Sequence, residues 1–234
     1  MRTRWWIGND IVDLAEPGVA GKERDRRFMD RVFTPQERAH ILEAAAPTIA
    51  LWKTWAAKET AFKIASKLRR EGVIFAHRAF EVEPEAPNRP ARVRFEDLEI
   101  GVRWELARDY VHCIGHLARE RATALAERAT AGDGGPAWRR LFASVVHEGQ
   151  SMDGALSGAE QASVYSTASA RARLLARRLM ERWDLQGAEI VRVWRTWGWG
   201  PPVVAREGAP LPAFDVSLSH DGRFVAAAIV GPGA

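Results

Sequence analysis

The sequence of 234 residues predicts an α+β fold, because strand-like runs and helix-like runs share the chain in separate groups. Residues 5–14 are rich in aromatic and β-branched residues, as strands are. Residues 48–70 hold no Pro or Gly and repeat apolar residues at spacings near three and four, which is typical of a helix. Three strand-like runs follow this helix, and a second helix with strands of its own comes later.

The first strand carries a candidate acid. Gly8 inside it indicates a bulge or a close approach of another backbone. Alternation places Asp10 and Val12 on one face and Asp13 on the other. An acid among apolar neighbours is costly to bury unless it is paired, and the alternative is an Asp at the strand end that faces water.

Two helices are expected next. Residues 22–32 are charged and predicted to be helical. Thr34 is a good N-cap, Pro35 fits the first helical position, and Glu37 completes a capping box, so a further helix should run to about Ala46.

The helix over 48–70 holds the densest group of polar candidates. Glu59 and Lys63 are one turn apart on the same face, and Lys58 projects about 100° away from Glu59. Taken alone, Glu59 and Lys63 also fit a solvated i,i+4 ion pair that contributes a few tenths of a kcal/mol.

Strand-like runs follow at 75–83, 91–95 and 102–117, the last broken near residues 108–109. His112 and His116 share a face of the last run, and we interpret them as half-buried strand histidines because no further ligand is spaced to join them. Residues 120–131 are predicted to be helical, and residues 132–158 to form a Gly- and Ser-rich linker.

The last third of the chain predicts a helix over 166–183 with a basic face, then a strand over 189–197 and a turn over 198–202. A strand over 213–220, a turn at Asp221-Gly222 and a return strand over 223–230 form a hairpin. The adjacent Ser219, His220 and Asp221 cannot adopt the geometry of a hydrolytic triad, so we expect Ser219 and His220 to hold a phosphate instead.

Composition narrows the class of protein. The formal net charge is +4, which suits nucleic acid, anionic lipid, a phosphorylated ligand or an acidic protein partner without choosing among them. The single cysteine, Cys113, excludes an intramolecular disulfide. No apolar run reaches the ~20 residues that span a membrane, so we expect a cytoplasmic protein that does not bind a membrane. No nucleic-acid-binding motif is present, so we expect no binding to nucleic acid.

Gly8-Asn9-Asp10, followed by Trp55-x-x-Lys58-Glu59-x-x-x-Lys63, resembles the signature of the 4′-phosphopantetheinyl transferases. The first half is most similar to their short class, the holo-acyl-carrier-protein synthases, whose active sites are shared between subunits of an oligomer. Residues 216–222 resemble the Ser-His motif of the longer, two-lobed class, and residues 172–177 its basic helix. In the longer class the lobe with the Ser-His motif comes first and the lobe with Gly-x-Asp second, whereas in this chain Gly-x-Asp comes first.

The resemblance implies two similar lobes, each an antiparallel sheet with helices, related by a pseudo-two-fold axis within a monomer. The lobes are expected at residues 1–128 and 164–234, joined by a linker at 129–163. The first would hold Gly-x-Asp and Lys-Glu-x-x-x-Lys, and the second the Ser-His motif.

The implied reaction moves the phosphopantetheine arm of coenzyme A to a serine of an acidic apo carrier protein from fatty acid, polyketide or nonribosomal peptide synthesis. Asp10 and Glu59 would bind Mg²⁺, and Asp10, Glu59 and Lys63 would be catalytic. The expected coenzyme A contacts are Lys58, Lys63, Arg173, Ser219 and His220. Two positions depart from the longer class: Val12 replaces a third acid, and Pro201 replaces the lysine of Gly-Lys-Pro.

Two other functions fit parts of the pattern. The missing third acid also suits a catalytically inactive module that binds coenzyme A or a carrier protein, which Mg²⁺-dependent labelling of a carrier would exclude. Salt-dependent binding to arbitrary DNA would instead indicate a basic nucleic-acid-binding protein.

Overall fold

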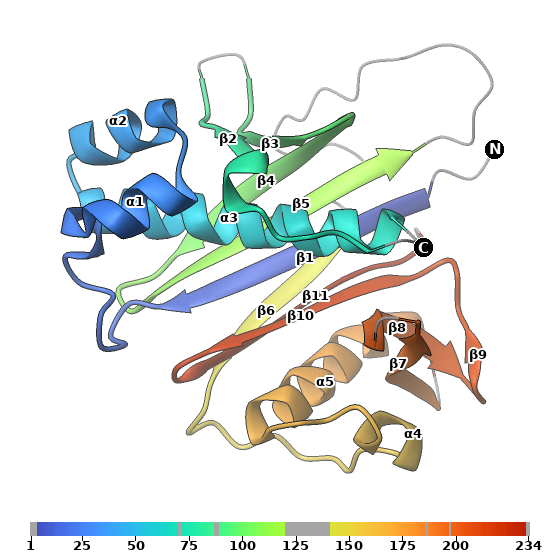
Figure 1. The fold of residues 1–234 in the computed structure, drawn as a ribbon. Helices are drawn as coiled ribbons and strands as arrows, with labels where there is room; N and C mark the ends of the chain where they lie inside the picture. The colour runs from blue at the N-terminus through green and yellow to red at the C-terminus, as the bar shows by residue number, and fades with distance from the viewer. Residues whose placement is uncertain are drawn as a thin grey trace.

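The computed structural model describes residues 4–69, 72–86, 89–119, 141–185, 187–196 and 198–232. It confirms the α+β prediction, because helices and antiparallel sheets share the chain (Figure 1). Within these ranges no helix is both long enough and apolar enough to cross a membrane.

The first lobe, residues 4–119, is a five-stranded sheet with one long helix across it. β1 (Arg4–Asp13) pairs antiparallel with β5 (Tyr110–Arg119). α3 (Pro47–Leu68) packs on both strands, and apolar side chains of the helix and sheet form the main core of this lobe. The sheet order is β1-β5-β4-β3-β2. Its other strands are β2 (Glu81–Glu83), β3 (Arg92–Phe95) and β4 (Leu98–Leu106).

Two glycines allow α3 to lie directly on the sheet. Gly8 of β1 and Gly115 of β5 face each other in register. A Cβ atom at Gly8 would collide with the carbonyl oxygen of Thr60, and one at Gly115 would come within 2.6 Å of Thr60 Cγ2. The structure therefore confirms the close backbone approach predicted at Gly8, and the pairing of β1 with β5 runs without a bulge.

Short helices precede α3, as the sequence predicts. They are η1 (Lys22–Arg24), α1 (Arg26–Val32) and α2 (Pro35–Glu43). The capping box of α2 is confirmed, since Thr34 Oγ1 accepts from the Glu37 N–H and the Glu37 carboxylate accepts from the Thr34 N–H.

The second lobe, residues 141–232, repeats the path of the first. Each lobe begins with a strand, continues through a helix and a set of antiparallel strands, and returns its last strand to pair with its first, β5 with β1 and β11 with β6. The lobes differ in their sheets, because the described strands of the first lobe form one sheet of five strands and those of the second lobe form two separate sheets of three. The elements are β6 (Leu141–His147), α4 (Gly158–Gln161), α5 (Thr167–Met180), η4 (Glu181–Trp183), β7 (Ala188–Arg195), β8 (Gly198–Arg206), β9 (Ala209–Pro210), β10 (Asp215–Asp221) and β11 (Phe224–Val230).

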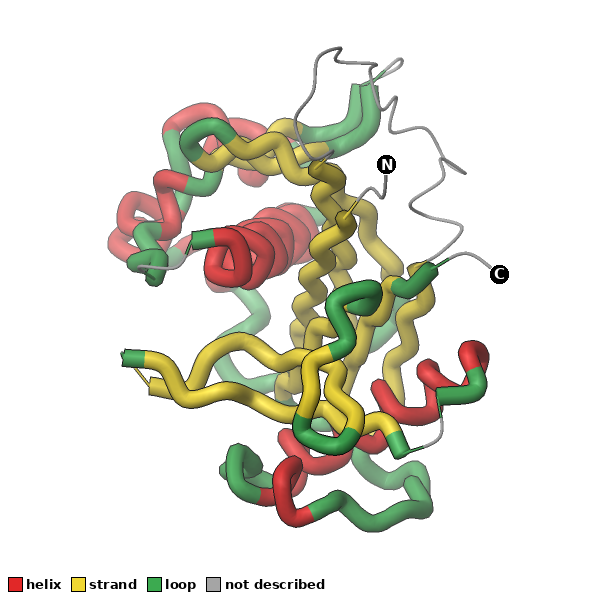
Figure 2. Tube along the Cα trace, turned by 90° about the vertical axis from the view of Figure 1, so that its right-hand side faces the viewer, coloured by secondary structure: helices red, strands yellow, loops and turns green. Residues whose placement is uncertain are grey.

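The two lobes meet through their sheets. The strands lie in the middle of the molecule, with α3 on one side and α5 on the other (Figures 1 and 2). Ile7 and Ile114 of the first lobe pack on Ala228 of β11, and Ile11 packs on Ala226. Small alanines on β11 let the sheets approach closely, so the interface is a buried apolar layer.

Three element predictions are wrong. Residues 75–80 do not form a strand but lead through η2 (His77–Ala79), and only 81–83 pair in the sheet. Residues 198–202 belong to β8, not to a turn. Residues 141–147 form β6 on β11, so the linker predicted at 129–163 cannot extend through them, and we propose that the second lobe begins at Leu141 instead of 164. The helix predicted at 120–131, the first-lobe boundary at 128 and the linker residues 129–140 lie outside the described residues.

Candidate active site

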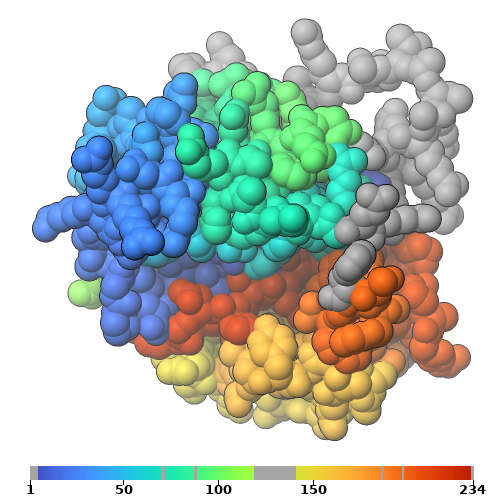
Figure 3. Space-filling model, in the orientation of Figure 1, coloured from blue at the N-terminus to red at the C-terminus, as the bar shows by residue number. Residues whose placement is uncertain are grey.

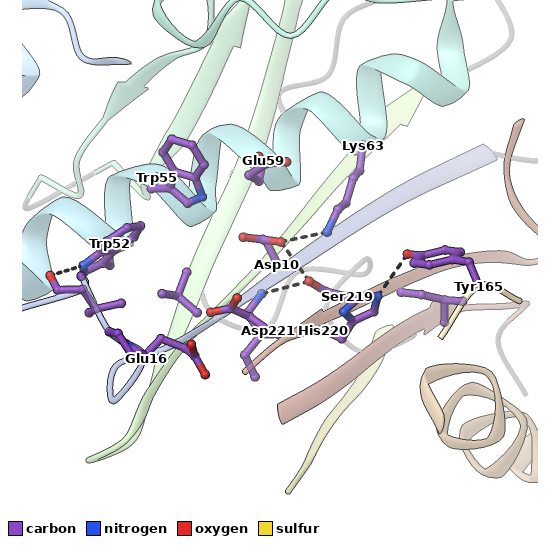
Figure 4. Close-up of a pocket in the computed structure, with 16 residues that line it drawn as sticks. Asp10, Glu16, Trp52, Trp55, Glu59, Lys63, Tyr165, Ser219, His220 and Asp221 are labelled. Carbon is purple, nitrogen blue, oxygen red and sulfur yellow. Dashed lines mark hydrogen bonds and ion pairs between the residues drawn. The ribbon is translucent and has the colours of Figure 1, made fainter. Parts of the chain in front are cut away.

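A cleft of about 580 Å³ opens between the lobes, along the seam that crosses the face shown in Figure 3. Both lobes line it (Figure 4). The first lobe contributes residues of β1, of the following loop and of α3, among them Asp10, Glu16, Trp52, Trp55, Glu59 and Lys63. The second lobe contributes Tyr165, Leu218, Ser219, His220 and Asp221.

Asp10 lies at the centre of this cleft. Its side chain shares a face of β1 with Val12, as predicted, and this face packs against α3 at Gly8 and Val12. Asp10 Oδ1 accepts from Lys63 Nζ at 2.9 Å and from the Ser219 hydroxyl at 2.9 Å (Figure 4). An acid that is 8% exposed is therefore compensated by one cation and one neutral donor.

Glu59 is the second acid, one helical turn before Lys63. Burial of its carboxyl, followed by repulsion from the Asp10 carboxylate, raises the pKa of Glu59 to about 7, and the nearby Lys63 opposes this only in part. The Lys63 ammonium donates to Asp10 and, at 2.7 Å, to the carbonyl oxygen of Asn9. It is thus committed to β1 instead of forming a solvated i,i+4 pair with Glu59.

The two carboxylates fit a hard divalent cation. Asp10 and Glu59 bring oxygen donors into one cleft, where a hard divalent cation would find carboxylate ligands. Among the described residues no group of three or more His, Cys, Asp or Glu side chains is arranged to hold a metal. The protein would accordingly supply two ligands and leave the other positions to water and substrate.

The second lobe brings Ser219 and His220 into the same cleft, as predicted. His220 Nε2 lies 3.1 Å from the Tyr165 hydroxyl, and burial, followed by the positive charge of Lys63, lowers the pKa of His220. Ser219 was expected to hold a phosphate, but in the structure its hydroxyl donates to Asp10 and accepts from the Ile11 N–H at 3.2 Å.

A second cavity, of about 330 Å³, adjoins the first and shares Lys63, Tyr165, Leu218 and His220 with it. Its wall includes cationic and aromatic or cyclic side chains, Lys67, Arg192, Trp199, Pro201 and Pro202. The two cavities lie next to each other between the lobes, and residues of both lobes line each of them.

Lys58 is not in the cleft, so its prediction as a coenzyme A contact is wrong. Its side chain is fully buried on the other side of α3, where Nζ donates to Glu37 Oε1 at 2.8 Å. The remaining donors go to the carbonyl oxygens of Phe80, at 2.6 Å, and His77, at 3.1 Å. Lys58 is a structural residue that joins α3 to α2 and η2.

Arg173 is also structural, although it lies at the wall of the second cavity. It is 1% exposed, and its guanidinium donates to the carbonyl and hydroxyl oxygens of Ser163 and Ser169 and to the carbonyl oxygen of Ile190. These five bonds match the five N–H groups of an arginine, so no donor is left for a phosphate.

Sequence reasoning did not single out several polar residues that line the two cavities, among them Tyr165, Arg192 and Lys67. Tyr165 and Arg192 stand in stretches without a motif, so no sequence signal could have found them. Lys67 lies one turn beyond Lys63 on α3, which does signal a shared face. Its Nζ donates to Asp215 Oδ2 at 2.8 Å and to the carbonyl oxygens of Ile7 and Val216, both at 2.7 Å.

Comparisons with known proteins agree with the motifs. The model of the 4′-phosphopantetheinyl transferase superfamily matches residues 7–126, just over half of the chain. The holo-[acyl-carrier-protein] synthase of Verminephrobacter eiseniae is 37% identical over 87 residues, which cover 37% of this chain and 65% of that protein. The one of Rhodopseudomonas palustris is 38% identical over 71 residues, 29% of this chain and 51% of that protein. Each match spans less than two thirds of the relative.

Solved structures of such synthases also match. The ACPS–CoA complex of Chronobacterium ammoniagenes has 23% identity and a TM-score of 0.40, covering 52% of this chain and 100% of that one. The synthase of Neisseria meningitidis has 20% identity and a TM-score of 0.39, covering 49% and 98%. The assignment itself rests on the family model, whose matched segment contains Asp10, Glu59 and Lys63: the chain belongs to the 4′-phosphopantetheinyl transferase superfamily.

Proposed function

We propose that this protein transfers the 4′-phosphopantetheine arm of coenzyme A to a serine hydroxyl of an apo carrier protein, with Mg²⁺ bound at Asp10 and Glu59. The observation that carries the proposal is the meeting of Asp10, Glu59 and Lys63 with His220 in one cleft between the lobes. Membership of the superfamily supports the same reaction.

In this reaction the serine oxygen forms a bond to the β-phosphorus of coenzyme A, and the phosphorus–oxygen bond to the leaving adenosine 3′,5′-bisphosphate breaks. A bound Mg²⁺ would neutralise charge on the pyrophosphate. Glu59 accepts the serine proton directly or through water. Lys63 and His220 line both cavities, where they can hold phosphate oxygens.

The direct test is incubation with coenzyme A, Mg²⁺ and a panel of apo acyl and peptidyl carrier proteins, with the product read by intact mass. The carrier should gain the mass of one phosphopantetheine. Asp10→Ala and Glu59→Ala should each abolish the gain while keeping the far-ultraviolet circular dichroism of the wild type. Glu43→Ala, which removes an exposed acid at the end of α2, is the matched control and should keep activity.

A binding module without catalysis remains the second candidate, because Val12 stands where the longer class has a third acid. It predicts that coenzyme A binds, by calorimetry, while no carrier on the panel gains mass. Full activity of either Asp10→Ala or Glu59→Ala would refute the assigned site instead.

We further propose that the carrier is acidic and that the protein works as a cytoplasmic monomer. The net charge of +4 supports the first part, because opposite charges steer association. The apparent affinity for the carrier should then fall as salt rises from low to physiological concentration. A flat response in a KM titration against salt would show that apolar contacts dominate.

A further inference from the structure

A row of side chains on β10 joins the two lobes. β1 is at the edge of its sheet, with β5 on one side only, so alternate N–H groups along its other side need acceptors from elsewhere. Four of these N–H groups, at residues 7, 9, 11 and 13, donate to side-chain oxygens of β10. The acceptors, in order, are Asp215 at 2.7 Å, Ser217 at 3.0 Å, Ser219 at 3.2 Å and Asp221 at 2.8 Å.

This side-chain ladder fixes how the lobes are aligned. Each donor and acceptor are 208 positions apart, so β1 and β10 run parallel in a single register. A shift of one residue would place Val216, Leu218 and His220 opposite the N–H groups. Valine and leucine cannot accept hydrogen bonds, which would leave buried donors without partners at a cost of about 1–3 kcal/mol each.

Ser219 differs from the other three rungs. Its oxygen accepts the Ile11 N–H of the ladder, and its own proton goes to Asp10 Oδ1 at 2.9 Å. Lys63 also donates to Oδ1. The hydrogen bonds that described residues make to the Asp10 carboxylate thus fall on one oxygen, and Oδ2 is the one left to face a cation in the cleft.

We propose that Ser219 is a positioning residue: as a rung of the side-chain ladder it holds the Asp10 carboxylate in one orientation, and it does not bind phosphate. Ser219 is 6% exposed, and its hydroxyl already has a donor partner and an acceptor partner within the protein. The second lobe thereby sets the geometry of the acid that the first lobe supplies. The catalytic consequence, though not the contact itself, rests on the proposed transferase function.

The hydrogen bond between Ser219 and Asp10 can be tested without an activity assay, by a double-mutant cycle on the urea unfolding of the metal-free protein. Each single variant, Asp10→Ala and Ser219→Ala, changes the unfolding equilibrium constant by some factor. Because the two side chains are bonded, the factor for the double variant should differ from the product of the two single factors by roughly fivefold or more. Ser217→Ala is the matched control, since among the described residues the Ser217 hydroxyl bonds to the Asn9 N–H and not to Asp10. With Asp10→Ala it should be additive within about twofold.

The consequence is tested by the Mg²⁺ dependence of transfer. Ser219→Ala should raise the Mg²⁺ concentration for half-maximal rate by about fivefold or more, with the KM for coenzyme A within about twofold of the wild type. Ser217→Ala should keep the Mg²⁺ requirement of the wild type. Ser219→Thr retains the hydroxyl, so its Mg²⁺ requirement should also equal that of the wild type and not that of Ser219→Ala.

Two results would overturn the inference. One is additivity of Asp10→Ala and Ser219→Ala in the unfolding cycle. The other is a raised KM for coenzyme A at an unchanged Mg²⁺ requirement, which would make Ser219 a phosphate ligand. Failure of the wild type to label any carrier would refute the proposed function but not the positioning contact, because the unfolding cycle decides that contact alone.

Discussion

Asp10 and Glu59 carry like charges in one cleft, yet their surroundings differ. Asp10 has Lys63 at 2.9 Å and the Ser219 hydroxyl, whereas burial and the charge of Asp10 hold the pKa of Glu59 at about 7. Glu59 can therefore exchange a proton near neutral pH in the metal-free protein, and the pH dependence of the unfolding free energy measures this.

Glu59 should make the metal-free protein less stable as pH rises. Its folded pKa, about 7, lies above the ordinary value of 4.5, so its contribution is fully present below pH 4.5 and is lost as pH rises through 7. Between pH 5 and 8, the wild type should lose on the order of 2–3 kcal/mol of unfolding free energy more than Glu59→Gln. Urea unfolding in EDTA measures this, and equal losses in the two proteins would show that the carboxyl is not destabilised by folding.

Lys58 provides a second prediction about single residues. Removing its ammonium leaves the buried Glu37 carboxylate without its cation, so Lys58→Met should cost about 3 kcal/mol of unfolding free energy. Lys53→Met, on the same helix, removes a lysine that stacks at 4.8 Å on Trp104 and should cost below about 1 kcal/mol. The KM for coenzyme A should be unaffected in both, and an increase in Lys58→Met alone would return Lys58 to the coenzyme A site.

At the scale of elements, the site depends on how closely α3 approaches β1. The absence of a side chain at Gly8 brings the backbone of β1 against Thr60, one residue after Glu59. The helix therefore sets the separation of Asp10 from Glu59 and Lys63.

Gly8→Ala should consequently separate α3 from β1. The added methyl collides with backbone rather than with a flexible side chain, so we expect a loss of about 2–3 kcal/mol in unfolding free energy and a reduced transfer rate. Gly158→Ala, at the start of α4, meets no atom within 4 Å and is the control. If Gly8→Ala matched this control in both stability and rate, the close contact would not be what positions the acids.

Sequence patterns predicted the elements whose signals are local. The capping box at Thr34 and Glu37 and the hairpin turn at residues 221–222 depend on neighbouring residues, and both are present. The turn predicted at 198–202 failed because Pro201 and Pro202 are tolerated in β8, where β9 pairs only with residues 205–206 and leaves the strand edge open. Residues 75–80 turn where the carbonyl oxygens of His77 and Phe80 accept from Lys58, a tertiary contact that no local pattern contains.

The part of the site that the sequence predicted consists of residues in recognisable motifs. Asp10, Glu59, Lys63 and His220, which the motifs bring together, line one cleft, and their roles there stay predictions. Lys58 and Arg173 are buried instead: helix geometry already turns Lys58 about 100° away from Glu59, but the partners that bury each cation, Glu37 for Lys58 and the serines 163 and 169 for Arg173, are tertiary contacts that no local pattern contains. The ladder had a visible signal, the alternation of Asp215, Ser217, Ser219 and Asp221, but its meaning depends on an edge strand 208 positions earlier.

At the scale of the whole molecule, one chain supplies both walls of the cleft. Asp10 and Glu59 come from the first lobe, and Ser219 and His220 from the second. The ladder and the buried Lys67–Asp215 ion pair, at 2.8 Å, hold the two together. A site completed within one chain needs no second subunit, whereas the resemblance of the first half to the short class would allow a site shared between chains.

Mixing two defective variants distinguishes these possibilities most directly. Asp10→Ala lacks a first-lobe acid and His220→Ala lacks a second-lobe contact. If each site is built within one chain, the rate of carrier labelling in an equimolar mixture equals the sum of the rates of the two variants measured alone. A site shared between chains would pair the intact first lobe of one variant with the intact second lobe of the other, and a mixture clearly faster than that sum would contradict the intramolecular site.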